Sequence, residues 1–290
     1  MNSKSFLITG TTKLYCVIGH PIAHSFSPIM HNANFQDLGL DYVYVAFDVR
    51  PDHLEKAVNG FRALGIKGIN VTIPHKETII KYLDEIDPIA EKMAAVNTIK
   101  NENGVLKATN TDAGGAKKSL LDAGCEISGK NVLIVGSGGV TRAISFILAE
   151  DVGRMVLTDI DEDRAINLTA EVKQKTGANV EGKFSTEDIL KQEIEKTDIL
   201  INCTPIGMYP ETDMSPVPKS LLHNGLFVFD VIYNPLETQL MKDAANIGCQ
   251  TLGGLDMLVN QGVLAFEWWT GKTPNSQLMK NKIIDFLGIK

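Results

Sequence analysis

The sequence predicts an α/β protein with two domains. Short apolar runs rich in β-branched residues alternate with helical patterns along the whole chain, and this alternation is typical of parallel sheets covered by helices. The chain has 290 residues, of which 44% are hydrophobic, so it can build two cores of ordinary size. It contains no internal repeat and no low-complexity segment.

The first third of the chain shows this alternation clearly. A Ser27-Pro28 start and a Gly39 stop predict the first helix, because proline suits the first helical turn and glycine suits the end. Asn103-Gly104 predicts a hairpin turn, because both residues tolerate positive φ. We expect strands at residues 14–19, 42–49, 68–73 and 97–107, and helices at 27–39 and 51–64.

A second domain is expected from about Gly114 onward. A helix ends at Gly124, and an apolar strand after a polar link then runs into the glycine-rich turn Gly136-Ser137-Gly138-Gly139. Further strands are expected at 155–159, 198–203, 226–232 and 250–252, and helices at 257–269 and 276–287. We therefore predict a first domain of residues 1–113, completed by the C-terminal helices in 255–290, and a second domain of residues 114–254.

Composition excludes several classes of function. The formal net charge of -7 and the pI near 5.4 argue against a nucleic acid or an anionic membrane as partner, since both require clustered lysine and arginine. Cys16, Cys125, Cys203 and Cys249 lie far apart, without a C-x-x-C pair, so we expect reduced thiols and neither a disulfide nor a metal site. The first ten residues lack the apolar stretch of a signal peptide, which indicates a cytoplasmic protein.

The glycine-rich turn is the strongest motif. It stands between an apolar strand and an apolar helix, where glycines let the backbone approach a pyrophosphate at the helix N-terminus. Asp159 ends the next strand about 20 residues later, as the dinucleotide-binding pattern requires. Thr141 takes the third glycine position, so helix and strand are expected to pack slightly less closely. The motif predicts a Rossmann-type doubly wound sheet; a tight turn without a ligand is the alternative.

Asp159 also bears on the choice of dinucleotide. A carboxylate there can accept hydrogen bonds from ribose hydroxyls and repels a 2′-phosphate, and no basic residue follows before Arg164. We therefore expect NAD to be favoured, with NADP not excluded. Asp161 is expected to cap the next helix.

Two constellations stand in the first domain. Ser25 and Ser27, beside a helix start, can direct hydroxyls at one carboxylate, although Ser27 taken by itself is better interpreted as a helix N-cap. Lys76 follows a strand end, where a solvated surface lysine is the usual interpretation. Asp112 offers it a carboxylate partner, and such a pair can move the hydroxyl proton when an alcohol is oxidised by hydride loss.

These motifs resemble those of the shikimate dehydrogenases, including their quinate/shikimate relatives. The resemblance covers nearly the whole chain and rests on separate blocks of sequence. The blocks are residues 24–28, 70–76, 95–98, 110–112, 136–139 with Arg142, 202–208, 230–235 and 254–261. It implies an N-terminal substrate domain and a dinucleotide domain facing each other across a cleft, with the last helices returning to the first domain.

The resemblance also implies roles for individual residues. Lys76 and Asp112 match the catalytic pair. The substrate-binding positions are Ser25, Ser27 and Tyr233 for the carboxylate, and Thr72, Asn97 and Gln261 for the ring hydroxyls. The cofactor is expected to contact Gly136, Ser137, Gly138, Gly139, Val140, Asp159, Arg164, Thr204, Pro205, Gly207, Met208, Val231 and Gly254.

Two departures from the family pattern stand out. NADP-using members commonly carry Asn-Arg-Thr after the second strand, whereas this chain has Asp159-Ile160-Asp161, which is closer to NAD-using quinate/shikimate members. Thr141 replaces a common alanine in the glycine turn. Ser25 and Thr72 fit shikimate, but quinate stays open as a substrate because the two acids differ little.

The expected function is oxidation and reduction between shikimate and 3-dehydroshikimate, in aromatic amino acid biosynthesis by way of chorismate or in quinate use, by a monomer or homodimer. A methylene-tetrahydrofolate dehydrogenase would share the architecture, but the serine pair and the Lys76/Asp112 couple argue against it. A non-catalytic sensor of NAD(P) with the same fold is the alternative of a different class. Such a sensor should have lost Lys76 or Asp112, and both are present.

Overall fold

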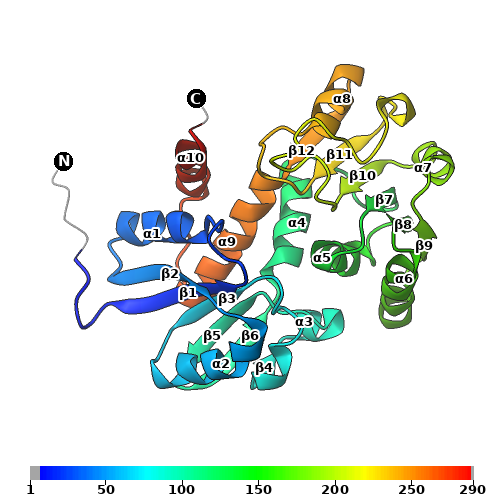
Figure 1. The fold of residues 1–290 in the computed structure, drawn as a ribbon. Helices are drawn as coiled ribbons and strands as arrows, with labels where there is room; N and C mark the ends of the chain where they lie inside the picture. Colours follow the sequence, from blue (N-terminus) through cyan, green and yellow to red (C-terminus); the bar gives the residue numbers. More distant parts are fainter. Residues whose placement is uncertain (1–6, 289–290) are drawn as a thin grey trace. The chain divides into compact units, whose positions relative to one another are not determined.

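A computed structural model describes residues 7–288 of the chain (Figure 1). The first six residues, which enter the expectation about a signal peptide, lie outside the described residues, as do residues 289–290. The chain divides into two compact units, Met1–Thr111 with Gln261–Lys290 and Asp112–Asn260. Both boundaries fall inside helices, because α4 (Thr111–Asp122) and α9 (Gly254–Thr270) run across them. They therefore differ by a few residues from the boundaries that the sequence predicts.

The first unit is built on a six-stranded mixed sheet. Its order is β2-β1-β3-β5-β6-β4. The strands are β1 (Lys13–Gly19), β2 (Tyr42–Asp48), β3 (Gly68–Val71), β4 (Glu85–Ile86), β5 (Thr98–Glu102) and β6 (Val105–Thr109). β1 pairs in parallel with β2 and β3, whereas β5 runs antiparallel to β3 and β6. β4 pairs in parallel with β6 at the other edge, so only the two pairings of β5 are antiparallel.

The helices of the first unit begin with local signals. The predicted start at Ser27-Pro28 opens α1, and the segment from Pro51 first forms a short 3-10 turn before α2. Asp87 caps α3, accepting from the backbone N–H groups of Ile89 and Ala90. The helices wholly within this unit are α1 (Ser27–Asp37), η1 (Pro51–His53), α2 (Leu54–Ala63), η2 (Ile80–Tyr82), α3 (Pro88–Met93) and α10 (Ser276–Leu287).

The predicted hairpin joins β5 to β6. Asn103 has φ 56° and Gly104 has φ 94°, so both occupy the conformation for which the dipeptide was singled out. β3 ends at Val71, two residues earlier than expected. The backbone beyond it turns, since Thr72 N–H donates to Ile18 and Thr72 itself accepts from His75 N–H.

The second unit has a six-stranded sheet that is parallel throughout. Its order is β12-β11-β10-β7-β8-β9 (Figure 1). The strands are β7 (Asn131–Val135), β8 (Arg154–Asp159), β9 (Val180–Phe184), β10 (Ile199–Asn202), β11 (Phe227–Asp230) and β12 (Gln250–Gly253). The helices are α5 (Gly139–Leu148), α6 (Glu162–Thr176), α7 (Glu187–Ile194), η3 (Lys219–Leu221) and α8 (Gln239–Ile247). This is the predicted doubly wound arrangement, and β7 lies at its switch point, between β8 and β10.

Each unit has its own core. In the first unit, Ile18, Ile69, Ile99 and Leu106 are fully buried in one cluster, and in the second unit Leu133, Leu200 and Val228 form the centre of another. All four cysteines are thiols. Among the described residues, no helix has both the length and the apolar composition needed to cross a membrane.

An aromatic cluster fills the space between α1, β2 and α9 in the first unit. His31 stacks on Tyr44 with ring centroids 4.5 Å apart, and Phe266 lies parallel to it on the α9 side. Trp269 packs against His31 and donates its indole N–H to the carbonyl of Ile99, 2.9 Å away. The C-terminal part of α9 is thereby attached to β5.

Candidate functional site

The glycine turn of the second unit follows β7 at the carboxyl edge of the parallel sheet. Gly136 has φ +97°, and a Cβ there would lie 3.0 Å from both the carbonyl carbon of Cys203 and Cγ2 of Thr204. A Cβ on Gly138 or Gly139 would instead meet nothing within 4 Å. Gly136 therefore allows the loop after β10 to pack directly against the turn. Gly138 and Gly139 leave open space at the N-terminus of α5, where a phosphate group fits.

Thr141 strengthens this turn. It is fully buried, and its hydroxyl donates to the carbonyl of Gly136 at 2.8 Å. The side chain that was expected only to loosen the packing of helix on strand therefore fastens α5 to the turn. Val140, the second residue of α5, is half-buried beside it.

Asp159 at the end of β8 holds the same turn from the other side. One carboxylate oxygen accepts from the N–H and the hydroxyl of Ser137, at 2.7 and 2.6 Å, and the other accepts from the N–H of Asp161 at 2.9 Å. Burial acts to raise the pKa of Asp159, but these hydrogen bonds and the charge of Arg164 hold the pKa below its usual value. The side chain is therefore an anion committed to fixing the backbone.

The next helix begins as predicted at Asp161. The Asp161 carboxylate accepts from the N–H of Arg164 at 3.2 Å and caps α6. Arg164 itself lies in the first turn of α6 with an exposed side chain. It places a positive charge near the end of β8.

A buried hydrogen-bond network of polar side chains holds the loop after β10. Asn202 Oδ1 accepts from the N–H and the hydroxyl of Thr204, while Asn202 Nδ2 donates to Asp230 at 3.1 Å. Burial raises the pKa of Asp230, although the Thr238 hydroxyl and the N–H of Ile232 donate to its carboxylate. Asn202 and Asp230 stand in motifs noted in the sequence, but their mutual contact could not be predicted there.

The remaining predicted cofactor residues lie in this loop and in the loops after β11 and β12. Gly207 has φ +93° in the loop, with Pro205 and Met208 exposed on either side of it. Gly254 packs so closely on Val231 that a Cβ would overlap the Val231 carbonyl. The loops that carry these residues follow β10, β11 and β12, so they lie at the same carboxyl edge as the glycine turn.

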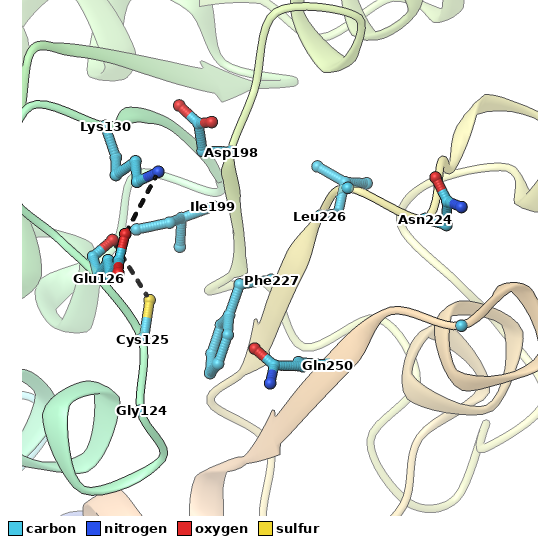
Figure 2. Close-up of a pocket in the computed structure, with 12 residues that line it drawn as sticks. Gly124, Cys125, Glu126, Lys130, Asp198, Ile199, Asn224, Leu226, Phe227 and Gln250 are labelled. Carbon is cyan, nitrogen blue, oxygen red and sulfur yellow. Dashed lines mark hydrogen bonds and ion pairs between the residues drawn. The ribbon is translucent and has the colours of Figure 1, made fainter.

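A separate pocket lies at the opposite end of this sheet (Figure 2). It has a volume of about 370 Å³ and is lined by residues at the starts of β7, β10, β11 and β12, among them Lys130, Asp198, Phe227 and Gln250. It contains none of the predicted site residues. Because ligands of doubly wound sheets bind at the carboxyl ends of the strands, this pocket is not the dinucleotide site.

In the first unit, β3 and the loops around it bring three predicted site residues together. The N–H of Val71 donates to the carbonyl of Asn97, and the N–H of Val96 donates to the carbonyl of Lys76. Thr72 directly follows β3 and precedes the same loop. The backbones of Thr72, Lys76 and Asn97 therefore meet at the carboxyl end of β3.

The Asn97 side chain is held by a dense set of hydrogen bonds. Its Oδ1 accepts from the N–H of Thr111 at 2.7 Å, from the Thr98 hydroxyl at 2.9 Å and from the Thr111 hydroxyl at 3.2 Å. Asn97 is 3% exposed. This amide is therefore rigidly oriented before any ligand binds.

The two serines stand at the carboxyl end of β1. Ser27 is the first residue of α1 and is buried, and the N-cap position is held by Phe26 without a side-chain cap. The alternative interpretation of Ser27 as an N-cap is therefore wrong. Its N–H donates to Ser25 Oγ at 3.3 Å, which links the two serines.

The remaining predicted residues have defined places in their own units. Gln261 is buried in the part of α9 that belongs to the first unit. Asp112 is the second residue of α4, and Tyr233 follows β11, both in the second unit. Burial raises the pKa of the Tyr233 phenol. Pairing of Lys76 with Asp112 stays a prediction.

Comparison with known proteins gives a consistent result. The model of the shikimate dehydrogenase substrate binding domain matches residues 17–99, and that of the shikimate 5'-dehydrogenase C-terminal domain matches residues 254–284. The chain is 48% identical to a shikimate dehydrogenase (NADP(+)) of Methanocaldococcus jannaschii over 282 residues, 96% of this chain and 99% of that protein.

Solved structures agree with this. A crystal structure of a shikimate dehydrogenase in complex with NADP+ superposes with a TM-score of 0.91 at 47% identity, covering 97% of both chains. A quinate dehydrogenase from Corynebacterium glutamicum in complex with NAD superposes with a TM-score of 0.88 at 29% identity, covering 94% of this chain and 99% of that one.

The expectation that NAD is the favoured cofactor is wrong, because the similar curated dehydrogenases are named for NADP(+). The physical reason lies in the turn. The argument for NAD required the Asp159 carboxylate to be available to ribose hydroxyls, whereas it accepts three hydrogen bonds from Ser137 and Asp161. A carboxylate at this position is therefore not by itself a sign of NAD.

Proposed function

The chain belongs to the shikimate dehydrogenase family, and from this premise we propose that it interconverts shikimate and 3-dehydroshikimate with NADP as the hydride carrier. The observation that carries the proposal is the likeness to curated shikimate dehydrogenases over 96% of the chain. The cluster of Thr72, Lys76 and Asn97 at the end of β3 supports it, because it gathers a proton carrier and hydrogen-bonding groups in one place.

We assign a different ligand to each of the two units. We assign the substrate to Met1–Thr111 with Gln261–Lys290, and the dinucleotide to Asp112–Asn260. In the first unit, Ser25 and Ser27 would hold the carboxylate by hydroxyl donors. Thr72, Asn97 and Gln261 would hold the ring hydroxyls, each with the hydrogen-bonding capacity that the role needs. Tyr233 of the second unit would complete the carboxylate site.

The second unit offers what a dinucleotide requires. The open space above Gly138 and Gly139, at the start of α5, suits the pyrophosphate. Arg164 carries an exposed positive charge that suits a 2′-phosphate, while Asp159 is occupied by the turn. The loop of Thr204, Pro205, Gly207 and Met208, held by Asn202, would contact the nicotinamide side of the cofactor. Val231 and Gly254 would also contact the cofactor. When bound, the dinucleotide supplies the acceptor for the hydride.

Lys76 and Asp112 would carry the proton. On oxidation, the C–H bond breaks with its electron pair leaving as hydride, the hydroxyl proton passes to the Lys76/Asp112 pair, and a ketone forms. On reduction, the pair returns the proton to the carbonyl oxygen. Lys76 suits this role because it follows β3 on a loop whose backbone is fixed by Val96.

Initial rates test this proposal. Shikimate and quinate are each offered with NADP and with NAD, and reduction of the nicotinamide is followed by absorbance. We expect turnover of shikimate with NADP, at a kcat/KM well above that of the other three mixtures. Quinate as the better substrate would move the chain to the quinate branch of the family. Binding of NADP without turnover of either acid would refute the proposal and favour the non-catalytic sensor.

A further inference from the structure

The Asn97 amide has a defined orientation that follows from one backbone group. A main-chain N–H can only donate, so the atom 2.7 Å from the N–H of Thr111 must be the amide oxygen of Asn97. The two threonine hydroxyls that reach the same oxygen agree with this assignment. Among the described residues, no hydrogen bond is donated by Asn97 Nδ2. The donor end of the side chain is thus directed away from the three groups that fix the oxygen.

A second buried amide is oriented in the same way. Asn70 Nδ2 lies 3.2 Å from the main-chain carbonyl of Asn97 and 3.1 Å from the Thr98 hydroxyl. A carbonyl can only accept, so this end of Asn70 must be its nitrogen. The Asn70 oxygen then faces the Tyr44 hydroxyl at 2.6 Å, and the phenol must donate.

Thr98 joins the two amides. Its hydroxyl oxygen accepts from Asn70 Nδ2, which leaves its single proton for Asn97 Oδ1 or the Thr111 hydroxyl. Thr98 is fully buried, so its hydroxyl depends on these protein partners and not on bulk water for its hydrogen bonds. The bonds therefore run in one direction, from Tyr44 through Asn70 to the residues that fix Asn97.

Tyr44 is a rigid start for this series. It is 1% exposed, its ring stacks on His31, and its main-chain N–H and carbonyl both bond the Asn32 side chain of α1 at 2.8 Å. Burial raises the pKa of its phenol well above the usual value, and Cys16 adds to this, whereas a hydrogen bond with Ser27 opposes it. The phenol is thus protonated across the physiological range, as a permanent donor must be.

We propose that Tyr44, Asn70 and Thr98 are positioning residues that hold Asn97 with its amide nitrogen towards the substrate, so that Asn97 acts only as a hydrogen-bond donor. This rests on the proposed function, in which Asn97 binds a ring hydroxyl. The hydroxyl must then accept from Asn97. A donor fixed in advance lowers the cost of ordering on binding, so disturbing the series should raise the KM for shikimate more than it lowers kcat.

The Thr98 hydroxyl gives the first test. Thr98→Val keeps the shape and removes the hydroxyl, and we expect the KM for shikimate to rise about tenfold, with the KM for NADP within about twofold of wild type. Thr98→Ser restores the hydroxyl and should restore the KM. Thr158→Val is the matched control: Thr158 is also fully buried in a strand, but its hydroxyl has no hydrogen-bond partner among the described residues. An unchanged KM in Thr98→Val would overturn the proposal.

A double-mutant cycle tests whether Tyr44 acts through Asn97. We expect Tyr44→Phe to raise the KM for shikimate about fivefold in the wild type and less than about twofold in the Asn97→Ala background. Equal factors in both backgrounds would mean that Tyr44 acts elsewhere, and the series would be rejected. Should Tyr44→Phe fail to fold, the Thr98 variants decide alone.

Asn97→Asp tests the direction of the bond. It keeps the oxygen that accepts from Thr111 and exchanges the donor for a charged acceptor, so the KM for shikimate should rise at least as much as in Asn97→Ala. A smaller rise would show that Asn97 accepts, contrary to the proposal. If Asn97→Ala itself leaves the KM for shikimate unchanged, the substrate assignment of the proposed function fails instead. The two failures are therefore distinguishable.

Discussion

The glycine turn of the second unit and the Asn97 cluster of the first unit are built by opposite means. The turn is made of backbone from consecutive residues, and the open space beside it exists because Gly138 and Gly139 carry no side chain. The Asn97 cluster is made of residues from β2, β3, β5 and α4 around Asn97, and its geometry depends on the specified partners of Asn97 Oδ1, Thr98 and the Asn70 amide.

Each unit is therefore sensitive to a different kind of substitution. In the second unit, an added methyl group should harm function more than a removed side chain. In the first unit, a removed polar atom should harm function, because its buried partners are then left without hydrogen bonds.

The largest effect is expected for Lys76. Lys76→Met keeps the length and removes the ammonium group, and kcat should fall by about 10² to 10⁴ because proton transfer loses its carrier. Steady-state rates with shikimate and NADP measure this. Lys81→Met is the control, since Lys81 is exposed and its ammonium group lies over the Tyr82 ring. Activity near wild type in Lys76→Met would remove this lysine from the reaction.

Two neighbouring glycines should separate folding from binding in the second unit. Gly136→Ala forces a Cβ at φ +97° against Cys203 and should lower the free energy of unfolding by about 1–3 kcal/mol. Gly138→Ala has room for its methyl group and an extended backbone at φ -79°, so its stability should stay within about 0.5 kcal/mol of wild type.

Binding of NADP should be affected in the opposite order, with Gly138→Ala weakened more than Gly136→Ala. The methyl group of Gly138→Ala occupies the space assigned to a phosphate, so the KM for NADP should rise about tenfold. Urea denaturation and steady-state kinetics measure the two quantities on the same samples. Unaltered NADP binding in Gly138→Ala would place the pyrophosphate elsewhere and break the contrast between the units.

Most of the parallel core could be predicted from sequence, because its information is local. β7 and the glycine turn form one continuous segment, and the Asn103-Gly104 hairpin depends on two adjacent residues. β9 was not predicted, because Val180–Phe184 is an edge strand with a glycine at its centre and one buried side chain, so it has no apolar run to detect. β4 was missed because two residues leave no periodicity to detect.

For the candidate site, the sequence predicts residues but not the contacts among them. Asn202 and Asp230 stand in recognisable motifs, yet nothing in either motif indicates that one donates to the other across neighbouring strands. The prediction that NAD is the preferred cofactor was wrong for the same reason. The partner that occupies Asp159 is Ser137, 22 residues earlier in the chain, and only the folded turn brings the two together.

The smallest expected effect concerns His31, whose ring lies against Tyr44 in the first unit. It is fully buried, and neither ring nitrogen has a hydrogen-bond partner among the described residues. Its neighbours are the rings of Phe35, Tyr44, Phe266 and Trp269, of which only the tyrosine can titrate. Burial lowers the pKa of His31 from 6.5 to about 3.

The pH dependence of stability follows from that shift. The unfolded chain takes up a proton near pH 6.5 and the folded chain only near pH 3, so His31 lowers the free energy of unfolding as the pH falls below about 6.5. Between pH 7.5 and pH 5.5 the loss should be about 1.4 kcal/mol. His31→Phe keeps an aromatic ring in the stack and cannot titrate, so urea denaturation of this variant should show a pH dependence smaller by that amount. An identical dependence in both proteins would mean that His31 takes up its proton as readily in the folded state as in the unfolded chain. The aromatic cluster around His31 and Tyr44 would then be accessible to water.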